Sequence, residues 1–246
     1  MATVHNRMVG ADSLPQSSWS VIRSTSDPLS PARQDRMTHL LTLYWRPVYR
    51  FVRASWGKAP EDCRQLAQDY FVAALETDLI ATHGLQNGGF RRFVKQSLVT
   101  FLVEKYADSG KPRARPPRDV IAFNPAEAES PSLALDQKRF KPEEVFDRQW
   151  AREIAARSLE RMQRELRDDG NEIVYRAWEA LEVHPTSPQA PTPEAASRIL
   201  GLPVPELMSH HETAQGLLGE LLVESVADYV ATRPEASQEL RDLFGG

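Results

Sequence analysis

The 246-residue chain has a single cysteine, Cys63, and no uninterrupted apolar segment near the roughly 18 residues that a membrane-spanning helix needs. One cysteine excludes an internal disulfide framework and a zinc site built from several cysteines. The first residues, MATVHNRMVGADSLPQSS, lack the apolar centre of a secretory signal. We therefore expect a cytoplasmic protein that makes no contact with a membrane.

The sequence motifs of common enzymes are also missing. The chain contains no GxGxxG, P-loop, HExxH or GxSxG pattern. Its six histidines are scattered, except for the adjacent His210 and His211, which diverge by about 100° on a helix and so do not chelate a metal as an i,i+4 pair does. We expect a protein that is not an enzyme, with no catalytic residues, no metal site and no cofactor, and with Cys63 as a buried thiol.

Neither sign of charge dominates, because 30 Lys and Arg stand against 34 Asp and Glu. The charge is nevertheless uneven along the chain. Residues 88–118 carry eight Lys and Arg and two acids, a net charge of +6, whereas residues 199–232 carry five acids and no Lys or Arg. The first segment favours contact with phosphate groups and the second opposes it.

Helical periodicity is what the sequence has in abundance. Apolar residues recur at three- and four-residue steps over 31–56, 60–76, 90–106, 143–168 and 172–182, and no segment has the alternation of a strand. Pro47 lies inside the first segment, which indicates either two helices or one kinked helix. A short helix after Pro193, a turn at Gly201 and a longer helix have the spacing of a helix-turn-helix. The predicted fold is all-α.

Composition suggests how these helices are grouped. Residues 1–30 are polar and aperiodic, which is typical of a flexible leader, and six prolines in 107–142 indicate a linker. We therefore predict two small helical domains, at 31–106 and 143–246, with the helix-turn-helix in the second.

Two surfaces of the first predicted domain are candidates for binding. The helix at 60–76 has a polar face that fits either a charged helical partner or simple solvation. The helix that begins near residue 90 interleaves aromatic and basic side chains, which suits either stacking on unpaired bases or a core helix with a solvated basic side.

Several segments occur in a particular order. WSVI and SPARQDRMTHLLTLYWRPVYRFVRASW are followed by PEDCRQLAQDYFVAALE, GGFRRFVKQSLVTFLVEKY, FDRQWAREIAARSLERMQREL and PEASQELRDLF. In this order and spacing they resemble the bacterial RNA polymerase sigma factors of the extracytoplasmic-function (ECF) group over nearly the whole chain. The segments YWRPVY, LAQDYF and FRRFV are the most specific of them.

The resemblance implies two binding roles for the first domain, which would be the sigma region 2. The helix at 60–76 would bind the clamp coiled coil of the β′ subunit of core RNA polymerase. The matching contact residues are Asp62, Leu66, Gln68, Asp69 and Phe71. The helix at 89–106 would face the minus-ten element of promoter DNA and capture an unpaired base with an exposed aromatic side chain. The cations that would hold its phosphates are Arg91, Arg92, Lys95 and Lys105.

The second domain, a sigma region 4 by resemblance, departs from the family. Its helix-turn-helix would read the minus-thirty-five element, yet VPELMSHHETAQGLLGELL lacks the clustered arginines that the family has there. Two functions therefore remain open: an ECF-type sigma factor that directs promoter recognition and opening, or a sigma-derived interaction protein that binds polymerase or a signalling partner without reading DNA. The resemblance also implies a Ser/Thr kinase or an anti-sigma factor as a regulator.

Overall fold

The computed structural model describes residues 17–25, 27, 29–56, 59–76, 89–107, 124–129, 140–183, 192–230 and 232–245. These residues form helices joined by short irregular segments, and no strand occurs in them, so the predicted all-α fold is confirmed. The chain divides into two compact units, one made of residues 1–151 with 226–246 and the other of residues 152–225. Each unit is described by itself.

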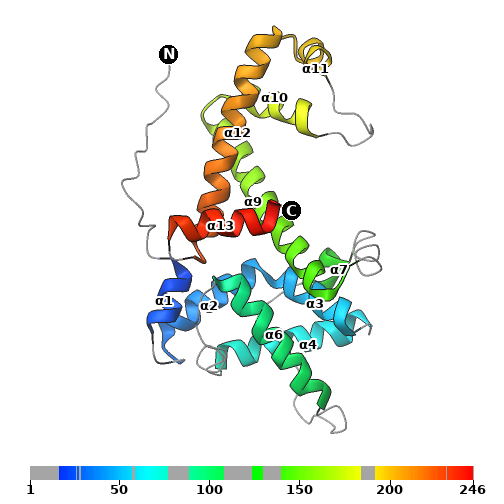
Figure 1. Ribbon diagram of the computed structural model, residues 1–246, viewed down its shortest axis with the longest axis vertical. Helices are drawn as coiled ribbons and strands as arrows, with labels where there is room; N and C mark the ends of the chain where they lie inside the picture. Colours follow the sequence, from blue (N-terminus) through cyan, green and yellow to red (C-terminus); the bar gives the residue numbers. More distant parts are fainter. Residues whose placement is uncertain are drawn as a thin grey trace. The chain divides into compact units, whose positions relative to one another are not determined.

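The first unit is built from helices that lie far apart in the sequence (Figure 1). They are α1 (Ser18–Ser24), α2 (Pro31–Leu43), α3 (Trp45–Trp56), α4 (Pro60–Glu76), α6 (Phe90–Ala107), α7 (Pro125–Ala128), the first turns of α9 (Pro142–Asp168), the end of α12 (Val204–Ala227) and α13 (Arg233–Phe244).

The question that Pro47 raised is answered by a break at Tyr44, which separates α2 from α3. Pro47 is the third residue of α3, and the N–H groups of a first helical turn have no partner within the helix. Proline therefore costs α3 no hydrogen bond there. The apolar residues that define the expected face of this segment are all buried: Leu40, Leu41, Tyr44, Val48, Phe51 and Val52.

The core of the first unit is a cluster of aromatic rings. Tyr44 and Trp150 stack with their planes parallel to within 1° and their centroids 3.9 Å apart, and Tyr229 meets both rings edge-on. The indole N–H of Trp150 donates to the Tyr229 hydroxyl over 3.2 Å in the buried interior. Phe90 and Phe146 complete the cluster.

Two short helices occur where the sequence suggests no regular structure. Helix α1 lies within the expected leader, and Ser17 caps it by accepting from the N–H of Ser20. Trp19 packs against Phe90 and Phe93, so burial of one aromatic ring orders a helix that is too short to show a period. Helix α7 lies within the expected linker, where Ala128 is fully buried.

The units also differ in extent from the predicted domain ranges. Residues after 226 pack in the first unit, not the second, and so do the first turns of α9. The N–H of Phe90 donates to the carbonyl oxygen of Tyr229, which satisfies one N–H at the start of α6. Gly89 allows this approach, because a Cβ there would lie 2.9 Å from the same oxygen.

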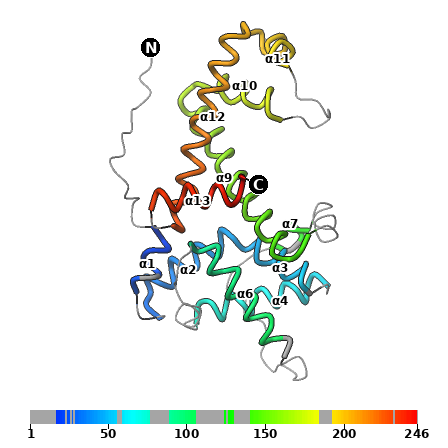
Figure 2. The backbone as a smooth tube through the Cα atoms, in the orientation of Figure 1, coloured from blue at the N-terminus to red at the C-terminus, as the bar shows by residue number. Residues whose placement is uncertain are grey.

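The second unit contains most of α9, α10 (Glu172–Glu182), α11 (Pro193–Leu200) and most of α12 (Figure 2). Gly170 and Gly201 end α9 and α11 with positive φ angles of 71° and 68°, which glycine adopts without strain. Leu166, Trp178 and Leu221 are among the residues of its core. The expected short helix, turn and longer helix are present, and their use as a DNA-binding helix-turn-helix stays a prediction.

No helix in the described part of the chain is long and apolar enough to cross a membrane.

Candidate functional site

The first candidate surface is the outer side of α4. Pro60 begins the helix with a φ that suits the first helical position, and Glu61 and Asp62 lie in the first turn, where negative charge is favourable. The inner side packs into the unit through a set of buried residues. They are Cys63, Ala67, Gln68, Tyr70, Phe71 and Ala74.

The five residues expected to contact polymerase divide between these two sides. Asp62 is exposed, while Leu66 and Asp69 are partly exposed. The side chain of Gln65 donates to the Asp69 carboxylate over 3.1 Å, which holds that carboxylate at the surface. Gln68 and Phe71 are 1% and 0% exposed, so they support the helix from inside.

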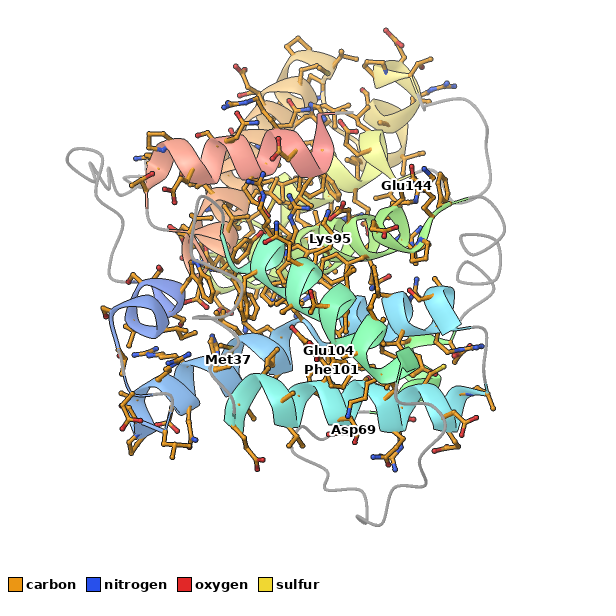
Figure 3. The ribbon with its side chains drawn as sticks, turned by 60° about the horizontal axis from the view of Figure 1, so that its bottom comes forward. Met37, Asp69, Lys95, Phe101, Glu104 and Glu144 are labelled. Carbon is orange, nitrogen blue, oxygen red and sulfur yellow. The ribbon has the colours of Figure 1, made fainter. Side chains whose placement is uncertain are left out.

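The second candidate surface is on α6, which lies beside α4 (Figure 1). The buried hydroxyls of Tyr70 and Ser97 are 2.8 Å apart, and the Tyr70 ring meets Phe101 edge-on at 5.6 Å. Figure 3 shows Phe101 on the side of α6 that faces α4, and Lys95 on the side that faces α9. The two sides of α6 therefore have different chemistry.

The described aromatic side chains of α6 do not form the expected base-capturing surface. Phe90, Phe93 and Phe101 are all buried, and Phe90 and Phe93 pack on Trp19. The side chain of Tyr106 lies outside the described residues. No exposed aromatic ring therefore occurs among the described side chains of α6, because Phe90, Phe93 and Phe101 pack in the core of the first unit.

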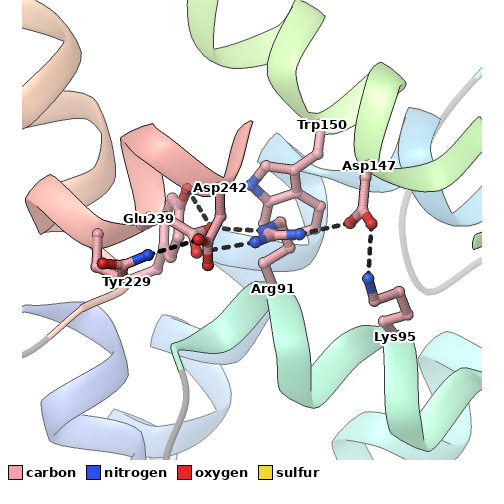
Figure 4. Close-up of polar contacts among 8 residues, drawn as sticks. Arg91, Lys95, Asp147, Trp150, Tyr229, Glu239 and Asp242 are labelled. Atoms are coloured by element: carbon pink, nitrogen blue, oxygen red, sulfur yellow. Dashed lines mark hydrogen bonds and ion pairs between the residues drawn. The ribbon is translucent and has the colours of Figure 1, made fainter. Parts of the chain in front are cut away.

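Two of the four expected phosphate-binding cations are paired with acids inside the first unit (Figure 4). Arg91 donates through Nη1 to Asp147 of α9, and through Nε and Nη2 to the two carboxylate oxygens of Glu239 of α13. Lys95 donates to the other oxygen of Asp147 over 2.7 Å. The Tyr229 hydroxyl donates to Glu239 over 3.2 Å.

The electrostatics of this cluster keep Arg91 charged. Burial opposes the charged guanidinium, but the hydrogen bonds and negative charge of Glu239, with that of Asp147, outweigh it and raise the pKa of Arg91. Burial is also the main cause that raises the pKa of the Tyr229 hydroxyl well above its ordinary value, so this hydroxyl stays protonated. We call Arg91, Lys95, Asp147 and Glu239 the charge cluster.

The other two expected cations have different surroundings. Arg92 is exposed on α6. Lys105 is partly exposed, and its ammonium lies 5.2 Å from the centre of the Phe101 ring, within range of a cation–π contact. The structure therefore brings together Arg91 and Lys95 but leaves Arg92 and Lys105 outside the charge cluster.

A further set of ion pairs was missed by the sequence reasoning. Arg53 of α3 pairs with Glu129, which also accepts from the Tyr49 hydroxyl, and Arg46 pairs with Glu127 over 3.0 Å. The hydrogen bond from Arg53 is the main cause that lowers the pKa of Glu129. No spacing in the sequence relates residues some eighty positions apart, so only the packing of α7 on α3 reveals these pairs.

The acidic character of α12 is present at its surface in the second unit. Glu206, Glu212, Glu220 and Glu224 are exposed, and Glu224 pairs with Arg161. His211 contacts Glu182 at 2.8 Å. The described residues contain no group of three or more His, Cys, Asp and Glu placed to hold a metal ion.

Comparisons with protein-family models, with curated proteins and with solved structures give no match to this chain.

Proposed function

We propose that the protein is a transcription initiation factor of the ECF sigma type, which binds core RNA polymerase through the outer side of α4. The observation that carries this proposal is the arrangement of α4, in which Asp62, Leu66 and Asp69 reach the surface while Gln68 and Phe71 anchor the helix. These are the positions that match the polymerase contact of the family. A rigid helix with an outward acidic and apolar edge suits a helical coiled-coil partner.

Contact with promoter DNA would be made by α6 in the same unit. Arg92 is exposed and Lys105 is partly exposed on the solvent side of α6. Lysine and arginine bind phosphates without reading sequence, so these side chains support affinity more than specificity. Phe90, Phe93 and Phe101 are buried, so any base capture would involve a residue other than these three.

One observation favours the second candidate, a sigma-derived interaction protein that does not read DNA. Arg91 and Lys95 are engaged by carboxylates, and α12 presents exposed acids with no Lys or Arg between Arg198 and Arg233. Both features reduce the attraction for phosphate. Such a protein would keep the α4 contact with polymerase and lack promoter-directed initiation.

Co-elution with core RNA polymerase tests the contact that both candidates share. Reversing the charge of Asp62 and Asp69 together to Arg should abolish co-elution, because both carboxylates lie on the proposed contact side. Glu61→Arg is the matched control for Asp62→Arg alone, since Glu61 is an exposed acid in the same first turn that is not among the contact residues. Equal loss in the control, or no co-elution of the unaltered chain, would reject the polymerase contact.

In vitro transcription then separates the two candidates. Specific initiation from a promoter library with core polymerase supports the sigma factor. Co-elution without initiation supports the interaction protein.

A further inference from the structure

Helix α13 covers the most buried cation of α6. Arg91 is 8% exposed as a residue, and Glu239 of α13 accepts two of its hydrogen bonds in a side-by-side arrangement (Figure 4). Planar guanidinium groups bind carboxylate and phosphate oxygens with this same geometry. Glu239 therefore occupies the position that a phosphate group would take on Arg91.

The second carboxylate of the charge cluster acts on both cations. Asp147 accepts from Arg91 with one oxygen and from Lys95 with the other. Arg91 and Lys95 are four residues apart on α6, so they lie on one side of the helix and would engage neighbouring phosphates if the acids were absent. Two carboxylates thus neutralise two cations that point the same way.

The apolar packing of α13 is limited. Ala236 is the one fully buried residue of this 12-residue helix, Leu240 and Leu243 are partly buried, and Phe244 is exposed at its end. The pairing of Glu239 with Arg91 attaches α13 to α6 within the first unit.

We propose that α13 is an autoinhibitory element: its Glu239 competes with the phosphate backbone of single-stranded nucleic acid for Arg91, and displacement of α13 opens the Glu239 side of Arg91 to a phosphate while Asp147 of α9 stays in place. This inference deepens the proposed function and rests on α6 as the DNA-contacting helix. The closed state withholds Arg91 until a nucleic acid, or a partner that binds α13, displaces the helix.

Binding of a labelled single-stranded DNA oligonucleotide to the full-length chain tests the competition. Glu239→Gln keeps the size of the side chain and removes its charge, so the open state becomes more populated. We expect affinity to rise about fivefold or more, which is an ordinary coupling between sites. Engagement of one further phosphate should steepen the dependence of log K on log salt by about 0.7 on a single strand.

Asp242→Asn is the matched control, because it removes one charge from the same helix at an exposed carboxylate that accepts from Gln238. Screening at ordinary salt should keep its effect below about twofold. Adding Arg91→Gln to Glu239→Gln should cancel the gain. Equal gains in Glu239→Gln and Asp242→Asn, or no gain in Glu239→Gln, would overturn the proposal.

Hydrogen exchange of the unaltered chain gives an answer even if Glu239→Gln fails to fold. Amides of residues 233–244 should exchange faster when the oligonucleotide is bound, and unchanged or increased protection would refute displacement. Failure of this inference is distinguishable from failure of the proposed function, because polymerase co-elution is measured separately. Co-elution with polymerase but no displacement of α13 supports the proposed function and rejects the inference. Displacement of α13 without co-elution supports the inference and rejects the polymerase contact.

Discussion

Replacing Trp150 should destabilise the first unit more than any exposed substitution. The indole is fully buried, stacks on Tyr44 at 3.9 Å and donates to the Tyr229 hydroxyl. Truncating a buried aromatic residue to alanine costs about 3–5 kcal/mol through lost transfer energy and the cavity that remains. A typical domain has a free energy of unfolding of roughly 5–15 kcal/mol. Trp150→Ala should therefore remove a large part of it.

A second substitution separates the ring from its hydrogen bond. Trp150→Phe keeps an aromatic ring on Tyr44, and the Tyr229 hydroxyl still donates to Glu239. The loss should be smaller, roughly 1–3 kcal/mol, because it combines one hydrogen bond with a smaller change of volume.

Urea unfolding followed by far-UV circular dichroism measures both losses. Val103→Ala on α6 is the control, since Val103 is 63% exposed and such changes stay within about 0.5 kcal/mol. A loss below about 1.5 kcal/mol for Trp150→Ala, or equal losses for Ala and Phe, would refute the reasoning from burial and stacking.

Two further predictions follow from the same unit. A chain that ends at residue 142 lacks Phe146, Trp150 and Tyr229, and burying three aromatic side chains contributes roughly 11–19 kcal/mol as an upper estimate. This fragment should therefore show no cooperative unfolding transition and no near-UV circular dichroism. Either signal would contradict the extent of the first unit. Glu129→Gln should be less stable than the unaltered chain at about pH 7, and this difference should shrink below the ordinary pKa of 4.5. The pairing with Arg53 lowers the folded-state pKa of Glu129, so the stabilisation is lost as the pH falls through the folded-state pKa. Unfolding midpoints at about pH 7 and about pH 3 check the trend, and a pH-independent difference would contradict it.

Local pattern determined most of the helices. The expected helices at 60–76 and 172–182 have those bounds in the structure, because a three-to-four-residue apolar repeat and a proline or acidic first turn specify where a helix begins and which face it buries. Cys63 is buried as its place in that repeat predicts. The same repeat does not predict α1 or α7, since a helix of one or two turns has too few positions to show a period.

The candidate site was less determined by the sequence than the fold. The pattern places basic residues on α6 and polar residues on α4, but it does not say which of them remain accessible. Gln68 and Phe71 match the expected contact yet face the interior. Phe90, Phe93 and Phe101 of α6 belong to the core for the same reason: a helix packed on two sides has little free surface.

The sequence by itself determined the all-α class, the helical faces and the uneven charge of the chain, because these depend on residues within a few positions of one another. Tertiary structure alone decided which charges meet. Arg91 is 56 residues from Asp147 and 148 residues from Glu239, and no local pattern relates them. Folding brings acids of α9 and α13 onto α6. The charge of the basic segment at residues 88–118 is thereby partly neutralised within its own unit.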